Sequence, residues 1–277
     1  IIIIWKIFLM NLEIVSDLHI DQWDPKFNIS NPCGEVKNSP LKWNLSDNIL
    51  VIAGDISDDL DRTCKYLNEL SNYYSTILFV DGNHEHVNHY PCLYSNEEIL
   101  KKINDYGNKN VKYLAKETYI KDNIAYLGYC GWWDYEKLDP EEIKRCMVYF
   151  DEWINYMDRQ QSLEFISNVF QRAKEEGEKL QQRIEELQKN EEVKEIVVVT
   201  HCVPISNLTD EGRLGTEHNQ KFQEILNKKY TKLKKWIFGH THQHYNQNIN
   251  GVQFLANARG RPEDFDRVNY SILKSKL

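Results

Sequence analysis

The hydrophobic pattern of the chain predicts a series of short buried strands. Nearly continuous apolar runs recur along the chain, and each is followed at once by glycine or polar residues. They span residues 12–15, 49–53, 77–80, 196–199 and 236–238. Because the apolar residues in these runs hardly alternate with polar ones, we expect strands that are covered on both faces.

Helices are predicted between these runs. Residues 58–70 repeat apolar side chains at helical spacing, and residues 96–107 end on a glycine, which commonly follows the last turn of a helix. The clearest helix start is Asp139, with Pro140 at the first helical position, and its apolar stripe continues to Met157. We interpret that stripe as facing the core, with a partner-binding groove as the alternative.

A second long helix is predicted from just after Ser162 to about Lys189, and its later part is highly charged with a thin apolar strip. The favoured interpretation is a solvated helix on the body of the protein. The alternatives are a protruding hairpin arm and a dimer surface.

The length and composition indicate a soluble globular protein. The 277 residues suit one large α/β domain, with 41% hydrophobic and 27% charged residues. The net charge of −8 disfavours capture of nucleic acid, which depends on lysine and arginine neutralising phosphates. The basic run at residues 228–235 is interpreted as a solvated helix face.

The cysteines and the amino-terminal residues bear on location. Six scattered cysteines contain no C-x-x-C spacing, which argues against a thiolate zinc site and a redox motif. Residues 1–9 are apolar but too short to span a bilayer, and they do not resemble a secretory signal. We expect a leader or an extension of the first strand there, then a single domain over residues 10–277 in the cytoplasm, without membrane association.

Side chains that can bind metals follow all five apolar runs. In chain order they are Asp17 and His19, then Asp55, then Asn83 and His84, then His201, then His240 and His242. In open α/β sheets, ligand sites form at the carboxyl ends of the strands. One histidine at a strand end is usually structural, but five such ends in order are hard to produce by chance.

The types of side chain predict a site for divalent ions. Carboxylate, imidazole and amide oxygen suit Mn²⁺, Fe, Zn²⁺, Ni²⁺ or Mg²⁺. Without His84, seven such groups remain, which exceed what one ion needs and suit two ions that share a carboxylate. Because alternate residues on a strand point to one face, Asp17 with His19, and His240 with His242, are each expected to reach one site.

The ordered series D-x-H, GD, GNHE, TH and GHTH resembles the calcineurin-like metallophosphoesterase superfamily, from Asp17 to His242. Each short motif is weak alone, but the ordered set is very specific. LGYCGWWDY at residues 127–135 and LANARGRPED at 255–264 are similar to segments of the small bacterial-type branch.

The resemblance implies an α/β fold in which a two-sheet β-sandwich is flanked by helices and carries two metal ions at one edge. Residues 140–190 would form a helical insert. Carried over by motif position, the first ion would be held by Asp17, His19, Asp55 and His242. The second would be held by Asp55, Asn83, His201 and His240, so Asp55 would bridge the two ions.

The implied function is hydrolysis of a small phosphodiester, with a phosphomonoester as the second substrate class. The nucleophile would be a metal-bridging hydroxide that attacks in line, and Mn²⁺ or Fe are the favoured ions. His84 would act as proton donor or transition-state stabiliser, with Asp55 as the second catalytic residue. Glu85 and Asp81 would support the metal ligands or the loop.

Other polar and aromatic residues near these motifs have two interpretations each. Trp132 and Trp133 either wall the substrate pocket or belong to the core. Arg259 and Arg261 either bind phosphate or form structural salt bridges. The remaining residues are interpreted as follows: His86, His89 and His218 as exposed loop histidines, His244 as an outer or surface residue, and Cys202 as a structural thiol.

Two alternatives belong to other classes of protein. One is a catalytically silent scaffold on the same fold that binds a partner through its helical arm; such proteins usually lose metal ligands, whereas this chain retains them all. The other is a metallo-β-lactamase-type hydrolase, which expects H-x-H-x-D-H, whereas residues 240–245 read HTHQHY.

Overall fold

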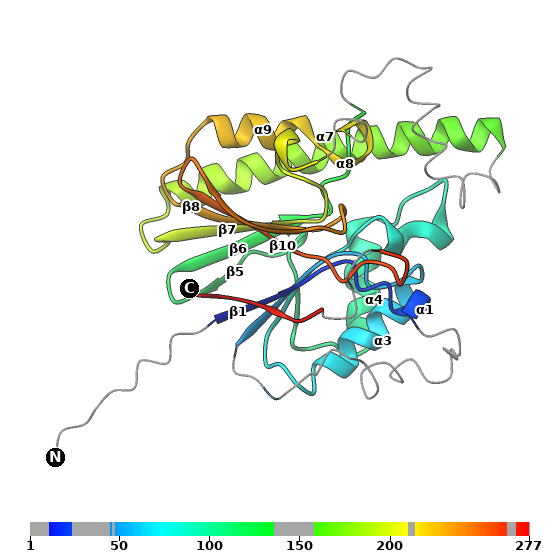
Figure 1. Ribbon diagram of the computed structural model, residues 1–277, viewed down its shortest axis with the longest axis horizontal. Coiled ribbons are helices and arrows are strands. Elements are labelled where there is room, and N and C mark those ends of the chain that lie inside the picture. The colour runs from blue at the N-terminus through cyan, green and yellow to red at the C-terminus, as the bar shows by residue number, and fades with distance from the viewer. Residues whose placement is uncertain are drawn as a thin grey trace.

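The computed structural model describes residues 11–23, 45, 48–135, 158–209, 214–264 and 270–276. The segment at residues 1–9, and the helix predicted from Asp139 to Met157, lie outside the described residues. Two β-sheets pack face to face, with helices on both outer faces (Figure 1). This arrangement confirms the predicted fold class, an α/β sandwich flanked by helices.

The first sheet has five strands in the order β11-β1-β2-β3-β4. Strands β1 to β4 run parallel to one another, and β11 is antiparallel to β1. The bounds are Asn11–Val15 for β1, Ile49–Ala53 for β2, Ile77–Val80 for β3, Val111–Tyr113 for β4 and Leu273–Lys276 for β11.

The second sheet has six strands in the order β5-β6-β7-β8-β10-β9. Strands β6, β7, β8 and β10 are parallel, and the two edge strands β5 and β9 are antiparallel to their neighbours. The bounds are Tyr119–Lys121 for β5, Ile124–Tyr129 for β6, Glu195–Thr200 for β7, Leu233–Phe238 for β8, His244–Ile249 for β9 and Val252–Asn257 for β10.

The central strands are apolar on both faces because both faces are covered. On β2, Val51 and Ala53 belong to the core between the sheets, together with Val199 of β7. The alternate residues Leu50 and Ile52 pack in the core that includes helix side chains. The nearly continuous apolar runs of the sequence follow directly from this double coverage.

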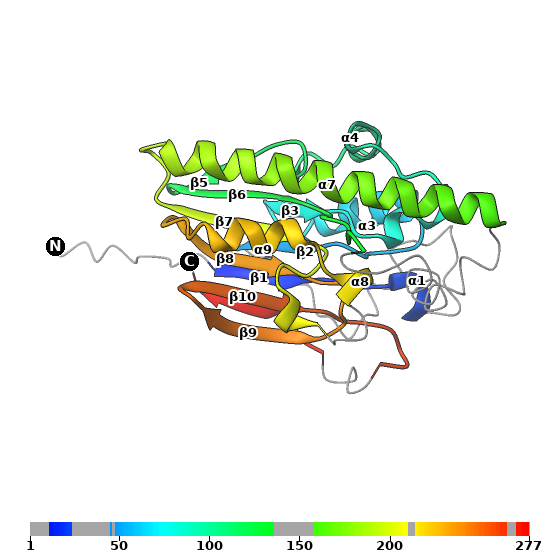
Figure 2. The same cartoon turned by 90° about the horizontal axis from the view of Figure 1, so that it is seen from above.

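In the described part of the chain, helices cover the outer faces of both sheets (Figures 1 and 2). α3 (Leu60–Leu70) and α4 (Asn96–Asp105) lie on the first sheet, and α7 (Arg159–Lys189) and α9 (Gln220–Asn227) lie on the second. Short helical turns occur at the strand ends: α1 (Ile20–Trp23), η1 (His84–His89), η3 (Ser206–Leu208) and α8 (Leu214–Glu217).

The long helix α7 begins at Arg159, four residues earlier than predicted. The Asp158 side chain accepts a hydrogen bond from the backbone N–H of Gln161, and the side-chain oxygen of Gln161 accepts one from the backbone N–H of Asp158. This capping box fixes the start of the helix. Leu180 and Ile184 of its apolar strip are fully buried. The interpretation of a helix on the body of the protein is therefore confirmed.

Apolar runs predicted five strands and missed β4, β5, β6, β9, β10 and β11. β4 and β5 are three residues long, and β9 is largely exposed with the polar sequence HYNQNI. Such strands are recruited by pairing with a neighbour, which a hydrophobic pattern does not report. Within the described ranges, every helix is too short or too polar to cross a bilayer.

Glu13 of β1 offers a test of the fold that is independent of the strand ends. It is 4% exposed and accepts hydrogen bonds from the hydroxyl of Tyr74 and the side-chain amide of Asn48. Burial would raise the pKa of Glu13, but these hydrogen bonds and Lys274 hold it below its usual value.

We predict that Tyr74→Phe lowers the free energy of unfolding by about 1.5–3 kcal/mol at pH 7, because ionised Glu13 loses a donor. A carboxylate with a lowered folded pKa stabilises above its unfolded pKa, and this is lost as the pH falls through the folded pKa. The difference from the unmodified protein should therefore shrink in urea titrations below about pH 4.3. Tyr73→Phe is the control, and an equal loss at both pH values would contradict the assignment.

Candidate metal centre

The two sheets are joined at the edge where the predicted ligands follow the strands. Ser16, just after β1, donates from its backbone N–H to the carbonyl of Asn257 at the end of β10, at 3.0 Å. The backbone N–H of Arg259 in turn donates to the carbonyl of Ser16 at 2.9 Å. These bonds join the carboxyl end of β1 in the first sheet to that of β10 in the second.

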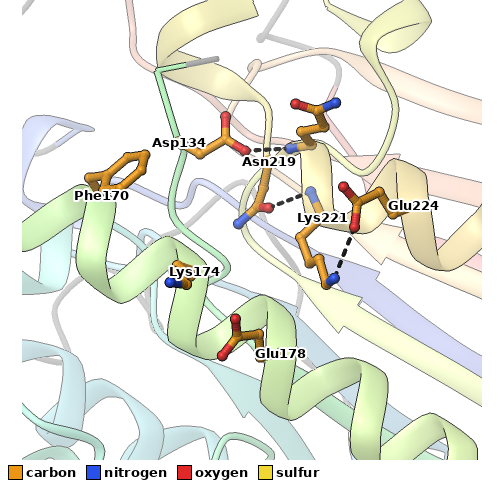
Figure 3. A pocket seen from close by; sticks show the side chains of 8 residues that line it. Asp134, Phe170, Lys174, Glu178, Asn219, Lys221 and Glu224 are labelled. Carbon is orange, nitrogen blue, oxygen red and sulfur yellow. Dashed lines mark hydrogen bonds and ion pairs between the residues drawn. The ribbon is translucent and has the colours of Figure 1, made fainter.

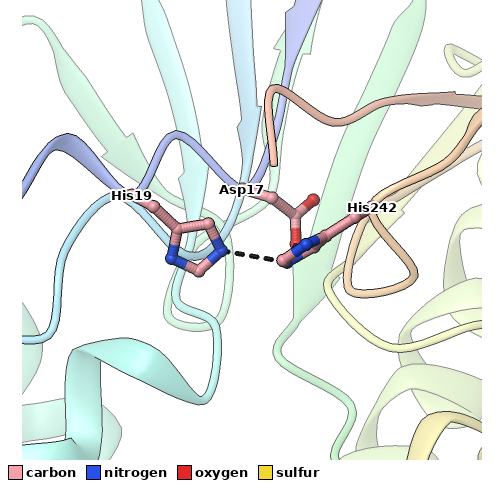
Figure 4. A group of neighbouring side chains, drawn as sticks. All are labelled: Asp17, His19 and His242. Carbon is pink, nitrogen blue, oxygen red and sulfur yellow. Dashed lines mark hydrogen bonds and ion pairs between the residues drawn. The ribbon is translucent and has the colours of Figure 1, made fainter. Parts of the chain in front are cut away.

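Asp17, His19 and His242 form the first group of side chains at this edge (Figure 4). One ligand atom from each lies within 4.8 Å of the other two. The Nε2 atoms of His19 and His242 are 3.0 Å apart, and His242 Nε2 is 3.7 Å from Asp17 Oδ1. Asp55 approaches the same group, with its Oδ2 4.0 Å from His19 Nε2.

Asp55, His201 and His240 form the second group. His201 Nε2 lies 3.1 Å from Asp55 Oδ2 and 3.2 Å from His240 Nδ1. The side-chain oxygen of Asn83 is also 3.1 Å from His201 Nε2. Asp55 therefore stands between the two groups, with one carboxylate oxygen near both.

Backbone carbonyls fix the tautomers of the two histidines in the second group. His201 Nδ1 is 2.8 Å from the carbonyl oxygen of Ala53, and His240 Nε2 is 2.9 Å from that of Thr216. Because a carbonyl only accepts, these nitrogens carry the protons of the neutral rings. The opposite nitrogens are His201 Nε2, beside Asp55 and Asn83, and His240 Nδ1, beside His201, and these are the nitrogens that a metal ion would bind.

In the first group, too, nitrogen and oxygen atoms that can bind a metal ion face one another. His242 Nδ1 is 2.6 Å from Asp264 Oδ2, so His242 Nε2 presents its lone pair to His19. His19 Nδ1 and Asp17 Oδ2 are buried and have no hydrogen-bond partner among the described residues. Buried polar atoms are normally paired, and the imidazole and carboxylate groups present fit a divalent ion in each group.

The pKa values of the cluster reflect its attraction for positive charge. Burial would raise the pKa of Asp55, but His201 and His84 hold it well below its usual value. Asp55 in turn raises the pKa of His201 against the effect of burial. Burial and His201 lower the pKa of His240 to about 3. Since metal ions compete with protons for these groups, the same site favours a metal ion.

His84 lies beside both groups and is held by two carboxylates. Its backbone N–H donates to Asp55 Oδ1 at 2.9 Å, and its Nε2 is 3.7 Å from Asp55 Oδ2. Its Nδ1 is 2.5 Å from Asp58 Oδ1, and its ring meets that of His19 edge-on with centroids 4.4 Å apart. Asp58, which the strand-end pattern did not single out, therefore orients this histidine.

The paired ligands converge for a different reason from the one predicted. β1 ends at Val15 and β8 at Phe238, so Asp17, His19, His240 and His242 are not strand residues. All four have φ angles between 42° and 72°, in the left-handed region. The expectation based on strand alternation is wrong; tight left-handed turns beyond the strands bring these side chains inward.

Gly82 and the buried Glu85 hold these loops close to Asp55. A Cβ on Gly82 would lie 2.1 Å from Asp55 Oδ1, so only glycine allows this approach. Glu85 accepts hydrogen bonds from the backbone N–H groups of Gly82, Asp55 and Ile56, at 2.6, 3.0 and 2.7 Å. It thereby holds together the loops that follow β2 and β3.

Several interpretations of neighbouring residues are corrected by burial. His86 is fully buried rather than exposed, and Trp132 and Trp133 are also fully buried, so both tryptophans belong to the core. Trp133 stacks on the ring of His240, with centroids 5.4 Å apart. Arg259 is 1% exposed and lies over the ring of Trp23, so it is structural.

Other residues take places that the sequence left open. His218 is buried, which corrects its interpretation as an exposed loop histidine, whereas His89 is partly exposed. His244 lies on β9, and its Nε2 donates to the carbonyl of Ala258 at 2.9 Å, away from both groups. Asp264, which sequence reasoning missed, accepts from His242 because the chain folds back between Arg261 and Asp264.

A hollow of about 270 Å³ lies between α7 and α9, away from these groups (Figure 3). It is lined by residues such as Phe170, Lys174 and Glu178 of α7, and by Lys221 and Glu224, whose side chains pair at 2.9 Å. No member of the two groups lines it.

Comparison with known proteins agrees with this geometry. The family model for the calcineurin-like phosphoesterases matches residues 10–244. The chain belongs to the calcineurin-like phosphoesterase family. Membership in this family implies a hydrolase of phosphoric esters that uses divalent metal ions, which agrees with the two groups of histidine and aspartate.

Relatives of this calcineurin-like phosphoesterase span nearly the whole chain. It is 23% identical to an uncharacterized protein of Acanthamoeba polyphaga mimivirus, over 93% of this chain and 94% of the relative. The fold is similar to a phosphopantetheinyl hydrolase from Mycobacterium tuberculosis, with a TM-score of 0.67, 17% identity, and 96% and 95% of the two chains covered. A dimetal phosphatase from Danio rerio gives a TM-score of 0.51, 12% identity, and 97% and 93% coverage.

The contact between His242 and Asp264 yields a prediction about metal affinity. Removing the carboxylate in Asp264→Ala should weaken the binding of one Mn²⁺ ion by about 10- to 100-fold, because His242 loses the partner that orients its ring. Calorimetric titration of metal-free protein measures the affinity of each site. Glu263→Ala, which removes the adjacent exposed carboxylate, should leave both affinities unchanged; equal weakening in the two variants would refute a specific role for Asp264.

Proposed function

We propose that this protein is a binuclear metal-dependent phosphoesterase whose substrate is a small phosphodiester. The proposal rests chiefly on one observation: lone pairs of nitrogen and oxygen converge on two neighbouring points that share the carboxylate of Asp55. Two points with a shared carboxylate suit a pair of divalent ions acting on one phosphoryl group.

The proposed ligands fall into two sets that share Asp55. The first ion would be held by Asp17, His19, Asp55 and His242, and the second by Asp55, Asn83, His201 and His240. The mixture of imidazole, carboxylate and amide oxygen favours Mn²⁺ or Fe, and Zn²⁺, Ni²⁺ and Mg²⁺ also fit these groups.

Bound there, two divalent ions would supply a hydroxide nucleophile at neutral pH and neutralise charge on the phosphoryl oxygens. The chain itself contributes orientation and a proton. Asp58 holds Nδ1 of His84, so the ring keeps one orientation and its Nε2 stays on the side of Asp55. We assign to His84 the transfer of a proton to the leaving oxygen of the substrate.

A proton from His84 would stabilise the alkoxide or aryloxide that leaves either a phosphodiester or a phosphomonoester, and we propose the phosphodiester as the first substrate class to test. The net charge of −8 favours a small substrate over a long nucleic acid. The hydrolase from Mycobacterium tuberculosis and the phosphatase from Danio rerio carry names of two different activities, and both substrate classes therefore belong in the assay.

A catalytically silent scaffold is the second candidate function. Such a protein would not need to keep a complete set of metal-binding side chains. Here three His/Asp groups capable of holding a metal ion lie at one edge, and all of them involve predicted ligands or His84. The intact set supports an enzyme over a scaffold.

We predict metal-dependent hydrolysis of bis(p-nitrophenyl) phosphate that is lost when the ions are removed and returns with Mn²⁺. His84→Gln should lower kcat by about 10²- to 10⁴-fold while two ions remain bound, because the variant loses proton transfer but no metal ligand. Asp55→Asn should abolish activity and reduce the number of bound ions.

His244→Gln serves as the control and should keep full activity, since His244 faces the carbonyl of Ala258. Hydrolysis of p-nitrophenyl phosphate in parallel separates diester from monoester preference. Full activity of metal-free protein would reject the proposed function, and reaction with monoesters alone would reject its diester preference.

A further inference from the structure

A buried chain of polar contacts joins α7 to the loops that carry Asn83 and His201. None of its members is a proposed metal ligand. The two residues on the helix are Arg172 and Glu176, one turn apart, with Arg172 Nε 2.6 Å from Glu176 Oε1. Glu176 is 1% exposed, which is unusual for a carboxylate in the middle of a helix that is otherwise rich in exposed charge.

Glu176 reaches His201 through a single peptide group. Its Oε2 accepts a hydrogen bond from the backbone N–H of Gly131 at 2.8 Å. The carbonyl of the same peptide group, that of Cys130, accepts from the backbone N–H of His201 at 3.0 Å. The carboxylate therefore holds the peptide that places the backbone of a proposed ligand, and hydrogen bonds in such a series strengthen each other.

Arg172 reaches the loop of Asn83 through a second series. Its Nη2 donates to the side-chain oxygen of Asn96 at 2.7 Å, and the hydroxyl of Tyr113 lies 3.0 Å from the same oxygen. That hydroxyl donates to Asp81 Oδ1 at 2.7 Å, and Asp81 Oδ2 is 2.9 Å from His86 Nε2. Asp81 and His86 flank Asn83 and His84, so both ends of this loop are held.

A third contact serves His240. The side-chain amide of Asn219 donates to the carbonyls of Gly131, Trp132 and Ala173, at 3.0, 2.9 and 3.1 Å, and Ala173 belongs to α7. The next residue, Trp133, stacks flat on the ring of His240 at an interplanar angle of 14°. The segment fixed by Glu176 and Asn219 thus also supports a third proposed ligand.

The charges of Arg172, Glu176 and Asp81 make this part of the structure sensitive to substitution. Burial raises the pKa of Glu176, and Arg172 opposes that effect while Asp81 adds to it. Removing the guanidinium would leave two buried carboxylates without their shared cation, which is strongly unfavourable unless the structure shifts or a carboxylate takes up a proton. Either response would disturb the peptide at Gly131 or the loop at Asp81.

We propose that Arg172 and Glu176 are positioning residues for the metal group of Asp55, Asn83, His201 and His240. The proposal rests on the metal centre proposed above. α7 is suited to this role because Leu180 and Ile184 anchor it in the core, and ligands are placed best by rigid elements. Within the described ranges, the contacts of this series lead to the loops of Asn83 and His201 and to the ring of His240.

The test is titration of metal-free protein with Mn²⁺, followed by calorimetry and by electron paramagnetic resonance, in which two neighbouring Mn²⁺ ions give a coupled spectrum. Arg172→Gln should weaken one ion by about 10- to 100-fold, the range found for residues that orient metal ligands. The second ion should change less than about 2-fold, and at one equivalent of Mn²⁺ the variant should show an uncoupled spectrum.

Arg183→Gln is the matched control. Arg183 also lies on α7, donates to the carbonyl of Leu114 and the hydroxyl of Thr118 at 2.8 and 2.9 Å, and lies over the ring of Tyr129. Its contacts with the described residues do not include the loops of Asn83 and His201. It should leave both Mn²⁺ affinities unchanged, and its urea midpoint in EDTA shows how far the loss of an arginine contact on α7 lowers stability without affecting the ions. Equal weakening of the ions by the two variants, or weakening by neither, overturns the proposal.

Milder variants cover the case in which Arg172→Gln does not fold. Arg172→Lys keeps the charge and Glu176→Gln keeps one acceptor oxygen, so each should weaken the same ion by a smaller factor. Failure of the parent proposal has a different signature: unmodified protein would then bind fewer than two ions. Unmodified protein that binds two ions, with all α7 variants unchanged in affinity, rejects the positioning role alone.

Discussion

The rest of the site depends on one buried carboxylate, that of Asp55. An ionised group that is 1% exposed requires positive charge close by, and the neighbours of Asp55 are His19, His84 and His201. His201 Nδ1 donates to a backbone carbonyl, so its Nε2 atom, which faces Asp55, is the position that either a proton or a metal ion can occupy. The buried carboxylate and the imidazole nitrogens around it are therefore best satisfied by a bound cation.

The fold makes such a concentration of polar groups sustainable. Parallel strands covered on both faces end at one edge, where the backbone leaves the sheet in left-handed turns and points side chains inward. Gly82 leaves room for the carboxylate, and Glu85 ties the loops after β2 and β3 to each other. Helix α7 covers the second sheet and, through Glu176 and Arg172, also holds the loops in place by hydrogen bonds.

The sequence predicted the fold class and the meeting of the strand ends because both leave a local signal: an apolar run, then a ligand-type residue. It did not predict Asp58 or Asp264, since each acts on a histidine that is distant in sequence, 26 and 22 residues away. The carbonyls of Ala53 and Thr216, which accept from His201 and His240, could not be predicted because every residue has a backbone carbonyl. Trp132 and Arg259 were ambiguous because burial is decided by elements that pack from elsewhere in the chain.

Crystals grown with Mn²⁺ provide the most direct test of whether two ions share Asp55. Anomalous diffraction at the manganese edge locates each ion without reference to activity. Two peaks are expected, one bound by Asp17, His19 and His242 and the other by Asn83, His201 and His240, with Asp55 in contact with both. A single peak, or two peaks of which Asp55 touches only one, would contradict it.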